Sequence, residues 1–227
     1  MYLAIEGVIG VGKTTLARML QPSFKASLLL EIFEENPFLS DFYADRERYA
    51  FQTQIFFLLS RYHQQRRSVP DVLVRDQNLI SDYTFDKDGL FASINLHGDE
   101  LEMYYRVHEA LAEKIPQPDM IVYLRASTEI LMRRIALRDR SYERNMERAY
   151  IDDLNRAYEL YFGSPHTVGY HPSAPMLVID TNDLDFVHNI DHLKYVDEQI
   201  QRALKQVPVQ SEFPFEYTEG SPVQQDT

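Results

Sequence analysis

Short apolar runs alternate with longer amphipathic segments along most of the chain. The runs predict β-strands over residues 2–5, 28–30, 79–81, 120–124 and 176–179, and a run at 72–74 competes for the third of these. Between them, apolar side chains at helical spacing predict helices over residues 14–20, 46–67, 99–114, 128–138, 147–162 and 192–206. Strands that alternate with helices are typical of a parallel sheet covered by helices. The pattern therefore indicates one α/β domain.

The composition changes near the C-terminus. Residues 207–227 are rich in Pro, Ser and Gln and carry no regular apolar spacing. Segments of this kind at chain ends are commonly poorly ordered. We therefore predict a folded domain over residues 1–206 and a poorly ordered tail over residues 207–227, in which Phe213 and Phe215 are the candidate docking side chains.

Charge and composition narrow the functional classes. The 227 residues include 35 Asp and Glu against 23 Lys and Arg, which gives a net charge of −12, and there is no cysteine. An acidic surface repels nucleic acids and anionic membranes, so neither is an expected partner. The lack of cysteine excludes disulfides, thiolate zinc sites and cysteine nucleophiles. No targeting segment or bilayer-spanning run is visible, so we expect a cytoplasmic protein.

One segment near the N-terminus matches a phosphate-binding pattern without a mismatch. Residues 7–14, GVIGVGKT, fit G-x-x-x-x-G-K-[ST] between a predicted strand and a predicted helix. In this motif, backbone N–H groups and the helix N-terminus surround phosphates, the lysine neutralises them, and the final hydroxyl ligates Mg²⁺. The residues that we expect to form this loop are Gly7, Val8, Ile9, Gly10, Val11, Gly12, Lys13, Thr14 and Thr15.

Other side chains indicate phosphoryl transfer to a small molecule. No Asn-Lys-x-Asp tetrad occurs in the chain, which disfavours a GTPase. Glu31 and Asp82 follow two predicted strands, and the carboxyl ends of parallel strands face the ligand crevice. Five arginines within twelve residues could close over a transferring phosphoryl group, namely Arg133, Arg134, Arg138, Arg140 and Arg144. The set predicts a small-molecule kinase.

Several segments, in order and spacing, resemble the deoxyribonucleoside kinase family, and most closely the bacterial deoxyguanosine and deoxyadenosine kinases. They are GVIGVGKTT, LLLEIFEENPFLSDFY, RERYAFQTQIFF, LISDYTFDKDGLF and RIALRDRSYE, and the resemblance covers residues 2–204. It implies a Rossmann-like P-loop kinase fold of three layers, with a five-stranded parallel sheet and an arginine-bearing lid. It also implies a homodimer that uses ATP and Mg²⁺ to phosphorylate the 5′-hydroxyl of a deoxynucleoside.

The resemblance implies catalytic roles for residues of this chain. Glu31 resembles the general base at the 5′-hydroxyl, and Asp82 would share Mg²⁺ with Thr14 or act as the alternative base. Lys13 would contact the phosphates. The residues that resemble the lid arginines are Arg134, Arg138 and Arg140, of which Arg134 is assigned to the nucleotide.

The resemblance also implies substrate contacts. Tyr43 and Glu143 resemble the residues that hold the sugar 3′-hydroxyl. Gln54 resembles the glutamine that reads the edge of the base, Asp88 lies where the family often has an acid at the base, and Phe91 is the candidate for stacking on it.

Tyr83 is a departure from the family pattern. Many members have an arginine directly after the acid that aligns with Asp82, whereas this chain reads Asp82-Tyr83-Thr84. The variant resembles the deoxyguanosine kinase branch, which favours a purine deoxynucleoside and leaves Tyr83 as a candidate substrate residue. The choice between deoxyguanosine and deoxyadenosine stays open.

Two alternatives belong to other functional classes. A nucleoside monophosphate kinase of the thymidylate kinase type would need extra cations for the acceptor phosphate, whereas residues 31–49 are acidic and aromatic. A nucleotide-binding module without catalysis would have no use for a base such as Glu31. A deoxynucleoside kinase is therefore the favoured interpretation.

Overall fold

The computed structural model describes residues 1–75, 77–163 and 174–206, and within them five strands form one parallel sheet. The strands are β1 (Tyr2–Glu6), β2 (Ala26–Leu29), β3 (Asn78–Ser81), β4 (Met120–Arg125) and β5 (Met176–Asp180). Their order is β2-β3-β1-β4-β5, so β1 is central, and Leu3 is aligned with Ile80 on one side and Met120 on the other. Every residue of β1 is buried, as expected for a strand covered on both faces.

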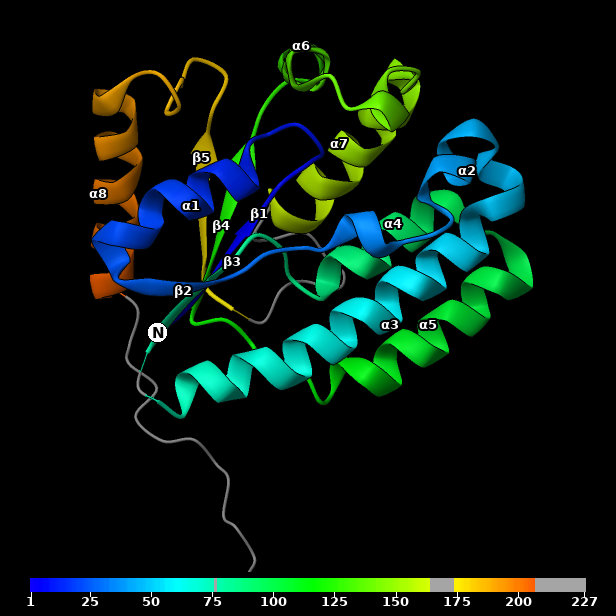
Figure 1. The fold of residues 1–227 in the computed structure, drawn as a ribbon, viewed down its shortest axis with the longest axis horizontal. Helices are drawn as coiled ribbons and strands as arrows, with labels where there is room; N and C mark the ends of the chain where they lie inside the picture. The colour runs from blue at the N-terminus through cyan, green and yellow to red at the C-terminus, as the bar shows by residue number, and fades with distance from the viewer. Residues whose placement is uncertain (76, 164–173, 207–227) are drawn as a thin grey trace, which may run out of the picture.

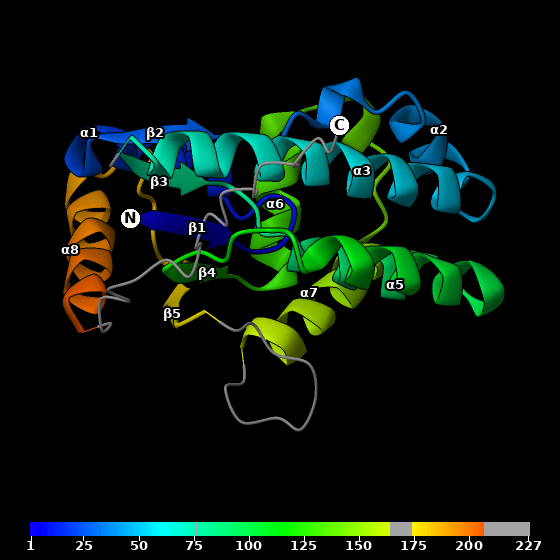
Figure 2. The same cartoon turned by 90° about the horizontal axis from the view of Figure 1, so that it is seen from below.

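Helices cover both faces of the sheet. In both views α1 (Lys13–Phe24) and α8 (Ile190–Gln206) lie on one side, and the remaining long helices lie on the other (Figures 1 and 2). These are α3 (Arg46–Leu73), α4 (Asp86–Asn95), α5 (Gly98–Ala112) and α7 (Arg148–Phe162). The short α2 (Leu39–Ala44) packs on α3, and α6 (Thr128–Arg138) packs on α7 near the carboxyl ends of the strands. The three-layer α/β fold with five parallel strands is confirmed.

The predicted strands and helices correspond to observed elements, with two exceptions of physical interest. The run at 72–74 ends α3 instead of forming a strand, because α3 continues past residue 67 to Leu73. The helices α2 and α4 had no predicted counterpart. In α4 the buried side chains include Lys87 and Asp88, so an apolar pattern does not reveal its inner face.

Two further predictions concern membrane-spanning segments and the end of the folded domain at residue 206. None of the helices in the described ranges combines the length and apolar character needed to cross a bilayer. The division at residue 206 stays a prediction, because residues 207–227, with Phe213 and Phe215, lie outside the described residues.

Packing at α6 yields a stability prediction. Leu131 is fully buried and Leu137 is 79% exposed, although both lie on this helix. We expect Leu131→Ala to lower the free energy of unfolding by about 2–5 kcal/mol, because it opens a cavity in the core. Leu137→Ala removes the same atoms from the surface and should stay within about 0.5 kcal/mol. Denaturant unfolding followed by circular dichroism measures both, and equal losses would contradict the packing of α6.

Candidate active site

The loop between β1 and α1 has the backbone of an anion site. Gly7 and Gly10 have φ of 147° and 88°, where side chains are strained. A Cβ at Gly7 would lie 2.5 Å from the carbonyl oxygen of Leu124, and one at Gly10 would lie 2.7 Å from the Ile135 side chain. The two glycines therefore let the loop pass close to β4 and α6. The loop enters α1 at Lys13, as the phosphate-binding motif requires.

The side chain of Lys13 folds back over this loop. Its Nζ donates to the carbonyl oxygen of Gly7 at 2.6 Å and to that of Val8 at 3.3 Å. Burial, followed by the positive charge of Lys87, lowers the pKa of Lys13 to about 8. The ammonium is therefore charged at neutral pH, and its present partners are neutral carbonyls that an anionic phosphate can replace.

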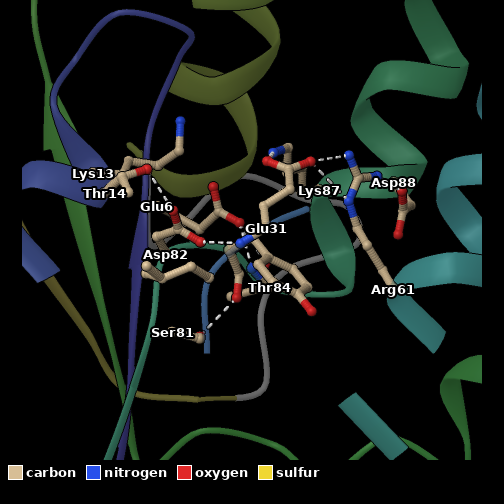
Figure 3. A network of polar contacts seen from close by, with 12 residues as sticks. Glu6, Lys13, Thr14, Glu31, Arg61, Ser81, Asp82, Thr84, Lys87 and Asp88 are labelled. Atoms are coloured by element: carbon tan, nitrogen blue, oxygen red, sulfur yellow. Dashed lines mark hydrogen bonds and ion pairs between the residues drawn. The ribbon is translucent and has the colours of Figure 1, made fainter. Parts of the chain in front are cut away.

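Asp82 joins the phosphate-binding loop to two strands. Its Oδ2 accepts a hydrogen bond from the Thr14 hydroxyl, and its Oδ1 accepts one from the backbone N–H of Glu31 at 2.8 Å (Figure 3). A hydroxyl and a carboxylate side by side form a donor set that suits Mg²⁺, which takes few protein ligands and completes its shell with water and phosphates. Within the described residues, no group of three or more His, Cys, Asp or Glu side chains could hold a metal alone.

Glu6, which the sequence reading did not single out, is completely buried at the end of β1. One carboxylate oxygen accepts from the backbone N–H and the hydroxyl of Thr84, at 2.6 and 3.0 Å. The other accepts from the N–H of Gly7 at 3.1 Å and from the Tyr158 hydroxyl at 3.3 Å. Glu6 therefore ties the start of the loop to the segment after β3 and to α7.

Glu31 follows β2 and lies between two buried cations. Arg61, on α3, donates to Oε1 through both Nε, at 3.1 Å, and Nη2. Lys87, in the first turn of α4, donates to Oε2 at 2.5 Å (Figure 3). Arg61 and Lys87 are only 5% exposed each, so these ion pairs are shielded from water.

The two cations decide the ionisation of Glu31. Burial alone would raise the pKa of this carboxyl, but the charges and hydrogen bonds of Arg61 and Lys87 outweigh it and hold the pKa well below the usual range. Glu31 is therefore an ionised hydrogen-bond acceptor at any physiological pH. It lies beside the Thr14–Asp82 pair, because its own backbone N–H binds Asp82.

Buried acceptors without partners lie next to this ion cluster. Arg61 also donates to Asp88, which is completely buried on α4. Gln54 precedes Arg61 by two helical turns on α3, and so shares its face. Among the described residues, Gln54 Oε1 and Asp88 Oδ2 have no hydrogen-bond partner. Leaving such atoms unpaired is costly, so they are candidates for contacts with the donors of a ligand.

Phe91 lies one turn further along α4 from Lys87 and is half-buried. The Lys87 Nζ lies 5.6 Å from the centre of its ring. The structure therefore brings the predicted stacking residue close to the predicted base-reading residue Asp88, on the same helix.

Two of the predicted lid arginines, Arg138 and Arg140, are paired with the predicted sugar residue Glu143. Arg138 donates to both carboxylate oxygens of Glu143, at 2.7 Å from Nη2, and Arg140 approaches the same carboxylate at 3.6 Å. Glu143 is 4% exposed and lies in the turn after α6. Next to it, Tyr142 stacks on Tyr43 with ring centres 6.0 Å apart and an angle of 15°. Tyr43 and Glu143 are thus brought to one place.

Two predicted residues occupy other surroundings. Arg134 makes hydrogen bonds of 2.7–3.2 Å to the carbonyl oxygens of Val11, Thr181 and Leu184, so it braces the phosphate-binding loop against the segment after β5. Tyr83 is fully buried in a small core cluster under α3, and its hydroxyl donates to Gln64. Because its ring packs in this cluster and its hydroxyl already has a partner, we do not propose a direct substrate contact for Tyr83.

The comparisons with known proteins agree with this geometry. The family model described as deoxynucleoside kinase matches residues 3–205. The deoxyguanosine kinase of Bacillus subtilis (strain 168) is 36% identical over 203 residues, which cover 89% of this chain and 97% of that protein. The deoxyadenosine/deoxycytidine kinase of the same organism is 28% identical over 213 residues, with 89% and 92% covered.

Solved structures of deoxyadenosine kinase from M. mycoides are similar as well. One, with the products dCMP and a flexible dCDP bound, has a TM-score of 0.75 and 26% identity, and the match covers 92% of this chain and 100% of that one. Another, with dATP bound, has a TM-score of 0.75 and 25% identity, with 88% and 99% covered. The phosphate-binding loop follows the central strand of a five-stranded parallel sheet, and the chain belongs to the deoxynucleoside kinase family of phosphotransferases.

Proposed function

We propose that this enzyme transfers the γ-phosphate of ATP to the 5′-hydroxyl of a purine deoxynucleoside, deoxyguanosine or deoxyadenosine. The observation that carries the proposal is the Glu31 carboxylate, ionised between Arg61 and Lys87 and joined through Asp82 to the phosphate-binding loop. A carboxylate at this place suits an attacking hydroxyl opposite a bound phosphate. Relatives named deoxyguanosine kinase and deoxyadenosine kinase support the acceptor class.

On the donor side, the loop residues 7–15 would surround the phosphates of ATP with backbone N–H groups. Lys13 would leave the carbonyls of Gly7 and Val8 and neutralise phosphate oxygens. Thr14 and Asp82 would hold Mg²⁺, which supplies charge stabilisation for the phosphates when bound. The Thr14–Asp82 hydrogen bond supports this pairing, because the two side chains already lie together.

Glu31 is the better candidate for the base than Asp82. Asp82 accepts from Thr14 of the phosphate-binding loop, its proposed partner for Mg²⁺, whereas the Glu31 carboxylate binds Arg61 and Lys87 and lies outside that pair. In phosphoryl transfer the hydroxyl needs orientation more than a strong base, because the transition state is loose. A firmly held, ionised Glu31 meets that need although its pKa is low.

The unpaired buried acceptors suit a base that presents N–H donors, and the proposed purines do so. Adenine presents an exocyclic amino group and guanine presents an amino group and an N1–H, and all of these are donors for Gln54 Oε1 and Asp88 Oδ2. Phe91 would stack on the base. Tyr43 and Glu143 would hold the 3′-hydroxyl, and the Tyr43 ring would leave little room for a ribose 2′-hydroxyl.

In the lid, Arg138 and Arg140 are the arginines placed to meet a transferring phosphoryl group. Their partner is Glu143, and the guanidinium of Arg140 also lies 4.1 Å from the centre of the Phe33 ring. Phosphate oxygens would replace the carboxylate as acceptors, with a geometry that suits the guanidinium fork. Arg134 would act on the nucleotide through the loop that it braces.

The alternatives fit the site less well. A monophosphate acceptor would need an available cation beside Glu31, but Arg61 and Lys87 are both paired with carboxylates. A nucleotide sensor would gain nothing from the costly burial of those ion pairs. A homodimer and a cytoplasmic location, which the sequence led us to expect, stay predictions.

A panel of acceptors tests the proposed reaction. We expect radiolabelled phosphate from ATP to reach deoxyguanosine or deoxyadenosine, with kcat/KM at least about tenfold above the matching ribonucleoside, because the Tyr43 ring crowds the 2′-hydroxyl. Transfer only to nucleoside monophosphates would favour the thymidylate kinase alternative. ATP binding without transfer to any acceptor would favour a binding module, and equal use of ribonucleosides would contradict the sugar argument.

The role of Glu31 can be tested by comparing its substitution with the same substitution at the nearby Glu34. We expect Glu31→Gln to lower kcat on the order of 10²–10⁴-fold, because the amide cannot accept the hydroxyl proton. Glu34→Gln, three residues later on an exposed turn, should keep wild-type kcat. Steady-state kinetics with the preferred nucleoside measure both. A mild Glu31→Gln together with an inactive Asp82→Asn would exchange the two roles.

The lowered pKa of Lys13 predicts a pH dependence of ATP binding. Below about pH 8 the ammonium is charged, and above it the amine becomes neutral and loses its attraction for phosphate. The affinity for ATP should therefore fall up to about tenfold per pH unit above pH 8. Calorimetry between pH 7.5 and 9.5, where ATP itself is fully ionised, measures this. Lys13→Arg stays charged and should flatten the profile; an equally steep profile in that variant would assign the titration to another group.

A further inference from the structure

Position 83, where the family pattern has an arginine, brings no cation to Glu31. Tyr83 is fully buried and points into the cluster formed with Tyr2, Leu29 and Val69. The end of β3 therefore contributes the Asp82 carboxylate but no positive charge. The cation on the Glu31 Oε2 side comes instead from α4, a helix that begins after β3 at Asp86.

Lys87 is that cation. Its side chain is 6% exposed, and Glu31 is its ion-pair partner among the described residues. Burial of an ammonium is unfavourable unless a partner compensates its charge, so the ion pair holds the Glu31 side chain in one orientation. Figure 3 shows Lys87 and Arg61 on the two sides of the Glu31 carboxylate.

Arg61 and Lys87 lie in different surroundings. Arg61 divides its charge between Glu31 and Asp88, and its guanidinium lies 4.4 Å from the centre of the Phe57 ring, inside the helical layer. The charge of Lys87, in contrast, reaches Lys13 and lowers the pKa of that residue. Lys87 therefore lies on the phosphate side of Glu31, and Arg61 on the side of the base-reading residues.

The hydrogen bonds also distinguish the two carboxylate oxygens. Oε1 of Glu31 accepts from two nitrogens of Arg61, which occupy both of its lone pairs. Oε2 accepts from Lys87 and keeps one lone pair without a described donor. An approaching hydroxyl can therefore donate to Oε2, directly beside the Lys87 ammonium.

We propose that Lys87 is a positioning residue for phosphoryl transfer, which directs Glu31 Oε2 at the acceptor hydroxyl. This rests on the proposed function. In the step, the bond between O5′ and the γ-phosphorus forms, the bond from that phosphorus to the ADP oxygen breaks, and the 5′-hydroxyl proton passes to Oε2. Lys87 keeps its protons throughout the step and forms no covalent bond.

Three variants test this assignment. We expect Lys87→Met to lower kcat on the order of 10–100-fold, a part of the effect of losing the base, while KM for nucleoside and ATP stays within about threefold. A merely structural role would disturb binding as well, so the difference between kcat and KM is the informative readout. Lys87→Arg, which keeps a cation, should recover at least part of kcat.

Lys114→Met is the matched control, because it removes the same charge from an exposed position after α5. It should keep wild-type kcat. Thermal unfolding of all variants sets an assay temperature at which each is folded. A wild-type kcat in Lys87→Met would overturn the assignment of Lys87, and so would a loss of kcat that Lys87→Arg does not recover or that comes with an equal rise in KM. Wild-type transfer to deoxynucleosides, measured first, tests the proposed function separately.

Discussion

Two buried carboxylates, Glu6 and Asp82, fix the place where the carboxyl ends of the central strands meet. A buried carboxylate is tolerated only when donors surround it, so each one specifies its neighbours. The donors to Glu6 come from the phosphate-binding loop, the segment after β3 and α7, and those to Asp82 come from the first turn of α1 and the end of β2. The loop, Glu31 and α4 are positioned relative to one another through these two groups.

In the same region, buried cations and buried carboxylates compensate one another's charge. The whole chain carries a net charge of −12, yet the cations Arg61 and Lys87 are buried in the site with Glu31 and Asp88. This cluster is close to neutral, so a neutral nucleoside can enter without a strong opposing field. Lys13 differs because its partners are carbonyl oxygens, and its charge is left for an anion. The site thus has a neutral half for the acceptor and a cationic half for the phosphates.

The sequence predicts those parts of the candidate site that follow local rules. The phosphate-binding loop has a fixed spacing, and Glu31 and Asp82 follow strands whose carboxyl ends share one edge. Arg61 and Lys87 were missed because each lies in a helix whose charged residues are numerous, and only tertiary packing shows which of them point inward. Arg134 looked like a free lid arginine for the related reason that its carbonyl partners lie 47 to 123 residues away. The seven-residue spacing of Gln54 and Arg61 was the one available signal.

The predicted lid arginines, Arg138 and Arg140, connect the two halves of the candidate site through Glu143. This carboxylate is the partner of Arg138 and Arg140, and its neighbour Tyr142 stacks on Tyr43 of the acceptor side. A phosphate that takes over the arginines leaves a nearly buried carboxylate without donors, which is unfavourable until another donor arrives. A sugar hydroxyl is such a donor in the proposed reaction. Because the arginines and Glu143 are each other's partners, a ligand on one side lowers the cost of binding on the other, and this coupling must be reciprocal.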